Sequence, residues 1–229
     1  MFSVITSVMV ATAASLTGAY VGTSGFSYPP WRGGFYPPKA KPAEFLAWFS
    51  ERLPSVELNT TFYQLPSEEQ LRRWATQTPP EFRFAVKMSR RITHGGRLEL
   101  LSTFTEQVRA LGERLGPILI QFPPTRTRDD GLLRLLLDSL DPELEYAFEF
   151  RHDSWAGVDV PVRVNSFDAA GTFRYFRLRE PPYDDESLRM WAGRFRPLLE
   201  NGTRIYCYFK HEDEPTAPLY AQRLLELLR

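Results

Sequence analysis

Residues 118–151 read ILIQFPPTRTRDDGLLRLLLDSLDPELEYAFEFR and contain the pattern that decides the fold. Short runs rich in β-branched and aromatic residues, at 118–122 and 146–151, are typical of strands, and the leucine-rich segment 131–140 between them has helical spacing. Asp129 and Asp130 lie just before that segment, where acidic side chains stabilise the start of a helix. The stretch therefore predicts a strand–helix–strand unit of a parallel sheet.

The same alternation of patterns continues through most of the chain. The predicted strands are 19–23, 55–59, 82–87, 118–122, 146–151, 162–165, 173–179 and 204–210, and the predicted helices are 43–52, 67–76, 104–115, 131–140, 187–199 and 218–228. Eight parallel strands interleaved with helices close a barrel, so we expect an α/β fold of the TIM (β/α)8 type. The chain has no Gly-x-Gly-x-x-Gly turn and no Walker loop, which argues against a nucleotide-binding doubly wound sheet.

One unit of the predicted barrel is short. Only ten residues, 152–161, separate the fifth predicted strand from the sixth. A parallel crossover usually needs about a dozen residues or more, and usually a helix. Either the helix after the fifth strand is short or absent, or the sixth strand is misplaced. A missing helix would leave an apolar flank that invites a partner or instability.

Composition excludes several classes of protein. The chain has 229 residues, with 28 basic and 28 acidic side chains and 43% hydrophobic residues, which is ordinary globular composition. Zero net charge without a basic stripe argues against a nucleic-acid partner. The lone cysteine, Cys207, can form neither an internal disulfide nor a zinc cluster, which favours a reducing compartment. We expect one cytoplasmic domain over residues 19–229, with no membrane partner; the sequence leaves the oligomeric state open.

Residues 1–18 form an apolar leader in front of the first predicted strand. Its first 16 residues are apolar, Ser or Thr only, and the first basic side chain is Arg32. A signal peptide should begin with a positive segment, although Ala11-Thr12-Ala13 resembles a cleavage site. The segment is also short for a membrane span. We expect it to lie outside the folded domain, and a weak secretion signal stays open.

Alternation along the strands predicts a polar ring inside one end of the barrel. In the second predicted strand, Glu57 and Asn59 share the face opposite Leu58. The same argument turns a further set of polar strand residues inward: Lys87, Gln121, Glu149, Arg151 and Lys210. In TIM barrels the active site lies at the carboxyl ends of the strands, and all three histidines, His94, His152 and His211, follow predicted strand ends.

Such a ring serves either a structural ion-pair network or a ligand, because unpaired buried charges cost several kcal/mol each. The catalytic candidates are Glu57, Lys87, Glu149 and His152. The carboxylates would act as general acid or base, whereas a desolvated lysine could instead form a Schiff base. The candidates for substrate binding are Asn59, Tyr63, His94, Gln121, Arg151, Trp31 and Lys210. Their aromatic members would stack on a ligand or simply roof the mouth.

A divalent metal is a further alternative. The chain has hard and borderline ligands near the predicted mouth: Glu57, Glu149, His152, His211 and Glu212. No ligand spacing among them is diagnostic of a particular metal, so the cofactor stays unknown.

Several motifs resemble one family. They are VGTSGFSYPPWRG at 21–33, VELNTTFY at 56–63, FRFAVK at 82–87, ITH at 92–94, GPILIQFPP at 116–124, AFEFRHDSW at 147–155 and YFKHE at 208–212. In this order they are similar to the YecE-like proteins, known as domain of unknown function 72, over about residues 19–228. The resemblance implies a TIM barrel and no particular activity. It places the family's characteristic polar residues at Glu57, Asn59, Lys87, His94, Gln121, Glu149, Arg151 and His152.

The chain departs from the family after the Phe-Arg-His motif. The family usually has a full helix there, followed by a strand ending in Asp-Ser. Here the stretch is contracted to residues 155–171, with Asn165-Ser166 as the nearest remnant, so any role of that aspartate is in question. The sequence thus predicts a small-molecule enzyme with acid/base carboxylates and a lysine at the barrel mouth. The alternatives are a non-catalytic protein that binds an anionic or sugar-like ligand, and a degenerate member without activity.

Overall fold

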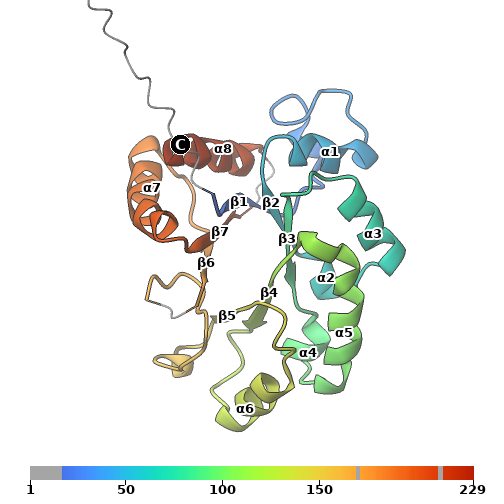
Figure 1. Ribbon diagram of the computed structural model, residues 1–229, viewed down its shortest axis with the longest axis vertical. Helices are drawn as coiled ribbons and strands as arrows, with labels where there is room; N and C mark the ends of the chain where they lie inside the picture. Colours follow the sequence, from blue (N-terminus) through green and yellow to red (C-terminus); the bar gives the residue numbers. More distant parts are fainter. Residues whose placement is uncertain (1–16, 169–170, 211–213) are drawn as a thin grey trace, which may run out of the picture.

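A computed structural model describes residues 17–168, 171–210 and 214–229. The leader predicted at 1–18 lies almost entirely outside the described residues, as do His211 and Glu212. In the part that is described, parallel strands form an almost closed barrel with helices outside it (Figure 1).

Seven of the eight predicted strands are confirmed within the described residues. They are β1 Ala19–Ser24, β2 Ser55–Leu58, β3 Arg83–Lys87, β4 Leu115–Phe122, β5 Tyr146–Phe150, β6 Phe173–Leu178 and β7 Arg204–Phe209. All pair in parallel, in the order β5-β4-β3-β2-β1-β7-β6. The barrel must therefore close between β5 and β6.

The segment predicted as the missing strand, 162–165, lies in this seam. The backbone N–H of Phe148 in β5 donates to the carbonyl of Val162 at 2.8 Å, and that of Val164 donates back to Phe148 at 2.9 Å. On the other side, the N–H of Asn165 donates to the carbonyl of Tyr175 in β6 at 2.9 Å. The prediction of a regular strand here is wrong, because Asn165 adopts a left-handed φ of 60° that ends the pairing after a single bridge.

The six predicted helices are all present: α1 Phe45–Ser50, α3 Glu68–Thr76, α5 Leu101–Val108, α6 Asp130–Ser139, α7 Asp185–Glu200 and α8 Thr216–Leu228. The starts of α6 and α3 have the expected capping, since Asp129 accepts from the N–H of Leu132 at 2.9 Å and Ser67 from that of Gln70 at 3.2 Å. Two short helices that the pattern did not predict, α2 Thr60–Tyr63 and α4 Arg90–Thr93, follow β2 and β3. Short 3-10 helices span Pro29–Trp31, Pro42–Glu44, Leu98–Leu100, Arg109–Arg114 and Asp153–Trp155.

The predicted contraction of the fifth unit is confirmed. Between β5 and the seam segment the chain forms only the 3-10 helix Asp153–Trp155, and in Figure 1 a loop runs where the ring of helices is interrupted. Trp155 is fully buried there, with ring centroids 5.3 Å from Phe122 and 4.7 Å from Phe150. Its indole N–H donates to the carbonyl of Arg126 at 2.8 Å. An aromatic side chain thus covers the part of the flank that a helix would otherwise cover.

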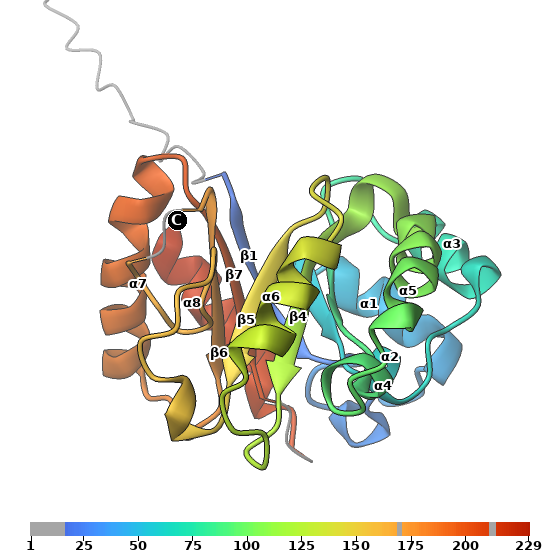
Figure 2. The ribbon, with the colours of Figure 1, turned by 90° about the horizontal axis from the view of Figure 1, so that it is seen from below.

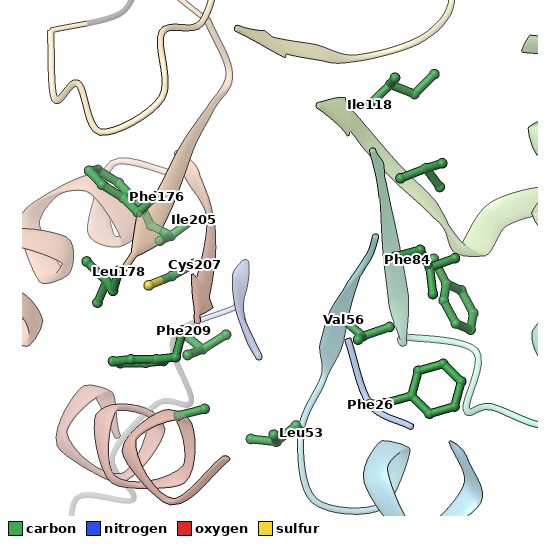
Figure 3. Packing of buried hydrophobic residues seen from close by; sticks show 14 of the residues in the cluster. Phe26, Leu53, Val56, Phe84, Ile118, Phe176, Leu178, Ile205, Cys207 and Phe209 are labelled. Carbon is green, nitrogen blue, oxygen red and sulfur yellow. The ribbon is translucent and has the colours of Figure 1, made fainter. Parts of the chain in front are cut away.

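Alternation divides the strand residues between two cores. The outward side chains pack beneath the helices, and Figure 3 shows Phe176, Ile205 and Cys207 on one side of the barrel and Phe84 on the other. The inward side chains fill the barrel: Ala85, Leu119, Ala147, Tyr175, Tyr206 and Tyr208. Gly22 lets β1 approach β2, because a Cβ at this position would lie 1.7 Å from the carbonyl oxygen of Ser55. This division leaves polar inward positions only toward the strand ends.

Among residues 17–168, 171–210 and 214–229, no helix is both long and apolar enough to cross a bilayer.

We expect Trp155→Ala to destabilise the protein by about 3–5 kcal/mol, because it removes a fully buried indole from the contracted flank. Leu135→Ala, at a site that is 60% exposed, is the control and should change stability by no more than about 0.5 kcal/mol. Urea unfolding with a constant slope would measure both. A loss below about 1 kcal/mol for Trp155→Ala would contradict its role as the cover of this flank.

Candidate functional site

Arg177 is the centre of the polar network at the mouth. Its side chain, 4% exposed, extends from β6 into the barrel. Nη2 donates to Oε1 of Glu57 at 2.9 Å, and Nη1 donates to Oε2 of Glu149 at 2.5 Å. A longer contact of 3.4 Å joins Nη1 to Oε1 of Gln121. One guanidinium therefore connects β2, β4, β5 and β6, and brings together three of the predicted inward residues.

Glu57 is fully buried and is held by three donors. Besides Arg177, the hydroxyl of Ser24 donates to Oε1 at 3.0 Å and that of Tyr175 donates to Oε2 at 2.8 Å. Burial alone would raise the pKa of Glu57, but the charge of Arg177 and these hydrogen bonds outweigh it and lower the pKa. Glu57 is thus an ionised anchor with no free proton to donate.

Glu149 is the second carboxylate of the network. Its side chain is 15% exposed, and Nε of Arg151 donates to Oε1 at 3.3 Å while Arg177 occupies Oε2. Both mouth carboxylates are therefore engaged by guanidinium groups.

A pocket of about 560 Å³ opens at this end of the barrel. In Figure 2 the arrowhead of β4 points toward the lower end of the molecule, where α2 and α4 also lie. The residues that line the pocket are Ser24, Tyr28, Asn59, Thr60, Phe62, Tyr63, Lys87, His94, Gln121, Pro124, Arg151, Arg177, Arg179 and Lys210. Most of the predicted site residues thus line this pocket. Glu57 and Glu149 do not line it themselves, but both form ion pairs with Arg177, which does.

Lys87 ends β3 and faces the pocket beside Phe62. Its Nζ lies 3.9 Å from the centroid of the Phe62 ring, and the hydroxyl of Thr61 in α2 donates to the Lys87 carbonyl at 2.7 Å. Burial lowers the pKa of Lys87 to about 8, helped by the charge of Arg177 and opposed by Glu57 and Glu149. This amine therefore exchanges its proton close to neutral pH.

His94 follows α4 on the same side of the pocket. Its ring packs edge-on against Phe62 with centroids 4.9 Å apart, and Nδ1 shares a hydrogen bond of 2.8 Å with the hydroxyl of Thr93. Burial lowers the pKa of His94, and so do the surrounding cations, of which Lys87 is the strongest. His94 is thus biased toward its neutral form, which can donate or accept a hydrogen bond.

The charges of the described pocket residues do not balance. Within the network, Arg177 and Arg151 offset Glu57 and Glu149. Three further cations line the pocket, namely Lys87, Arg179 and Lys210, and none of them forms an ion pair with any of the described residues. The pKa of Arg179 is lowered by burial and by the neighbouring guanidiniums of Arg177 and Arg151. Among the described residues, the pocket wall therefore has an excess of positive charge.

Two predicted site residues do not reach the pocket. Trp31 is fully buried among aromatic side chains, with its ring centroid 6.0 Å from those of Phe35 and Tyr36. His152 instead caps the short helix after β5, where its Nδ1 accepts from the N–H of Ser154 at 3.1 Å. Both follow strand ends, but the loops turn their side chains away from the mouth. Tyr63 lines the pocket and is 69% exposed.

The sequence-based prediction missed Arg177 and its neighbours Tyr175 and Arg179. Alternation in β6 puts Tyr175 and Arg177 on one face, and Arg179, just after the strand, lines the mouth pocket with Arg177. The alternation is visible in the sequence, but it does not show which face points inward. The opposite face, with Arg174 and Phe176, also has an arginine and an aromatic residue.

The three predicted metal ligands that the structure describes, Glu57, Glu149 and His152, have other partners. Glu57 and Glu149 bind Arg177, and His152 caps a helix. His211 and Glu212 lie outside the described residues. In the ranges that the structure describes, no three side chains of His, Cys, Asp or Glu form a group able to hold an ion.

The fold and the polar mouth define an α/β barrel of the TIM type with a pocket at the carboxyl ends of its strands. Residues 20–167 match the family described as "Protein of unknown function DUF72", and the chain belongs to this family. The resemblance predicted from the motifs is thereby confirmed.

Known relatives agree with this assignment. The chain is 34% identical to the UPF0759 protein YecE of Escherichia coli K12 over 139 residues, covering 58% of this chain and 48% of that protein. It is 27% identical to the UPF0759 protein YunF of Bacillus subtilis 168 over 182 residues, covering 74% and 63%. The chain thus spans about half the length of YecE and less than two thirds of YunF.

Solved structures show the same fold. A DUF72 family protein from Thermotoga maritima superimposes with a TM-score of 0.72 and 26% identity, over 92% of this chain and 98% of that one. A DUF72 family protein from Enterococcus faecalis superimposes with a TM-score of 0.72 and 17% identity, over 92% and 95%. The architecture is therefore shared even where few residues are identical.

Arg177→Met should cost about 3–5 kcal/mol of stability, because it leaves Glu57 buried without its charge partner. Arg151→Met is the matched control: its side chain is 32% exposed, and we expect a loss of no more than about 1 kcal/mol. Urea unfolding at pH 7 would compare them. If both variants lose a similar, small amount of unfolding free energy, Arg177 is not the centre of the polar network.

Glu57→Gln should change the acid limb of the stability profile. In the folded protein the pKa of Glu57 lies below its ordinary value of 4.5, so the unfolded chain takes up this proton first as the pH falls. Its stabilising contribution is complete above about pH 4.5 and is lost as the pH drops through the folded pKa. The stability gap between wild type and variant should therefore narrow below pH 4.5 in urea titrations; a constant gap from pH 7 to pH 3 would contradict this.

Proposed function

We propose that this protein is an enzyme that acts on a small organic anion at the barrel mouth, with Lys87 as the group that transfers a proton. The observation that carries the proposal is the set of three pocket cations, Lys87, Arg179 and Lys210, without carboxylate partners among the described residues. A bound anion would offset their mutual repulsion and accept charge-assisted hydrogen bonds from them.

Lys87 fits the role of the proton-transfer group. It lines the pocket, and its pKa of about 8 is near that at which an acid or base works best in neutral solution. The two carboxylates fit this role less well, because Glu57 and Glu149 are both bound to Arg177. The proposal thus keeps the predicted mouth and the predicted lysine but transfers the acid/base work away from the carboxylates.

A non-catalytic anion-binding protein is the second candidate. It is favoured by the engagement of both mouth carboxylates with Arg177, because neither Glu57 nor Glu149 is then free to act as a general acid or base. Binding to the same cations would then be the whole function. The two candidates differ in turnover and not in ligand class.

Binding of sulfate and of small carboxylates at low ionic strength should raise the melting temperature, and Lys87→Met should reduce that rise at least fivefold. Because the pKa of Lys87 is about 8, the effect of sulfate on wild type should weaken as the pH rises from 7 to 9. In Lys87→Met, the effect of sulfate on the melting temperature should not decrease over this pH range. Arg134→Met, which removes one charge from an exposed site in α6, is the matched control. If the anions raise the melting temperatures of the two variants equally, the proposal is wrong.

Turnover distinguishes the two candidates. Anions that bind would be incubated with wild type and with Lys87→Met, and their proton NMR spectra followed for several hours. New ligand signals with wild type alone would support the enzyme, whereas ligand recovered unchanged from every incubation would leave the binding protein as the function.

A further inference from the structure

A second hollow lies directly beside the mouth pocket. Its volume is about 490 Å³, within the usual range for sites of small molecules. It lies between the loop after β1, the segment that leads into α1, and α3. Most of its wall is apolar, formed by Phe26, Pro42, Ala43, Leu46, Leu58 and Trp74. We call it the apolar groove.

The apolar groove and the mouth pocket share one wall. Tyr28, Asn59 and Thr60 line both hollows. The hydroxyl of Tyr28 donates to the carbonyl of Ser24 at 2.8 Å, and Nδ2 of Asn59 donates to the hydroxyl of Ser24 at 2.6 Å. Since Ser24 also donates to Glu57, the shared wall is fixed by the network that holds Arg177. The two hollows are thus adjacent parts of one preorganised surface.

Their chemistry is complementary. The mouth pocket has three cations without carboxylate partners in the described chain, whereas the one charged residue that lines the apolar groove, Arg73, pairs with Glu69 at 3.3 Å. Aromatic rings form part of the groove wall: Phe26 and Trp74 meet edge to face with centroids 5.9 Å apart. An uncharged ring or chain would be stabilised there by burial, and would find no free charge to bind.

We infer that the substrate is an amphiphilic organic anion, with its acidic group in the mouth pocket and an aryl group in the apolar groove. This inference rests on the proposed function and narrows its substrate class. It requires the ligand to pass over Tyr28 and Asn59, which line both hollows. Simple anions would then occupy only half of the site.

A series of ω-phenyl carboxylates, with one to five carbons between ring and carboxylate, tests the inference by calorimetry against acetate. Wild type should bind the best member at least tenfold more tightly than acetate. Ala43 is exposed and lines the apolar groove, so the larger side chain of Ala43→Trp should fill it. This variant should bind the best phenyl carboxylate at least fivefold more weakly and should bind acetate and sulfate as wild type does. Ser102→Trp, at an exposed site in α5, is the control and should bind both as wild type does.

The outcomes separate the two proposals. If wild type binds acetate and sulfate, Lys87→Met weakens both, and no phenyl group adds affinity, the amphiphilic substrate is overturned while the anion site stands. A phenyl gain that Ala43→Trp leaves untouched also overturns the inference. If wild type binds neither the simple anions nor the phenyl carboxylates, both proposals fail.

Discussion

The pairing of Arg177 with Glu57 and Glu149 is the constraint on which this barrel depends. Backbone pairing around the barrel is continuous except between β5 and β6, where the segment 162–165 contributes a single bridge. The ion pair between Arg177 of β6 and Glu149 of β5 crosses that seam. The pair with Glu57 of β2 crosses the interior. Buried charges of this kind are tolerated only when they satisfy one another, so the network fixes the strand ends in place.

The same network determines what the mouth is able to do. Because both carboxylates are bound to Arg177, the other charged side chains among the described pocket residues are cations, and burial lowers the pKa of one of them, Lys87, to about 8. At the contracted unit after β5, Trp155 is buried in place of a helix. An apolar groove behind Tyr28 and Asn59 completes a surface with one charged and one apolar half.

Period-two alternation explains which site residues could be predicted. Glu57, Lys87, Gln121 and Glu149 lie within strands, where each neighbour points to the opposite face, so their inward direction follows from the chain alone. Trp31 ends one short 3-10 helix and His152 caps another, both in connections that follow strand ends, where no such rule applies, and their side chains do not line the pocket. Arg177 also follows the alternation, but its strand has arginine and aromatic residues on both faces. The sequence therefore did not show that its side chain points into the barrel.

By itself the sequence determined the barrel, the short fifth unit and the polar end, because strand and helix periods are local properties of the chain, and its motifs identified the family. The tertiary structure decided which charges meet. That Arg177 binds Glu57, 120 positions away, depends on the order of the strands around the barrel. So do the surplus of cations at the mouth and the lowered pKa of Lys87. Each of these features depends on side chains from several strands that are far apart in the sequence. A local sequence pattern does not show which of these side chains will be neighbours.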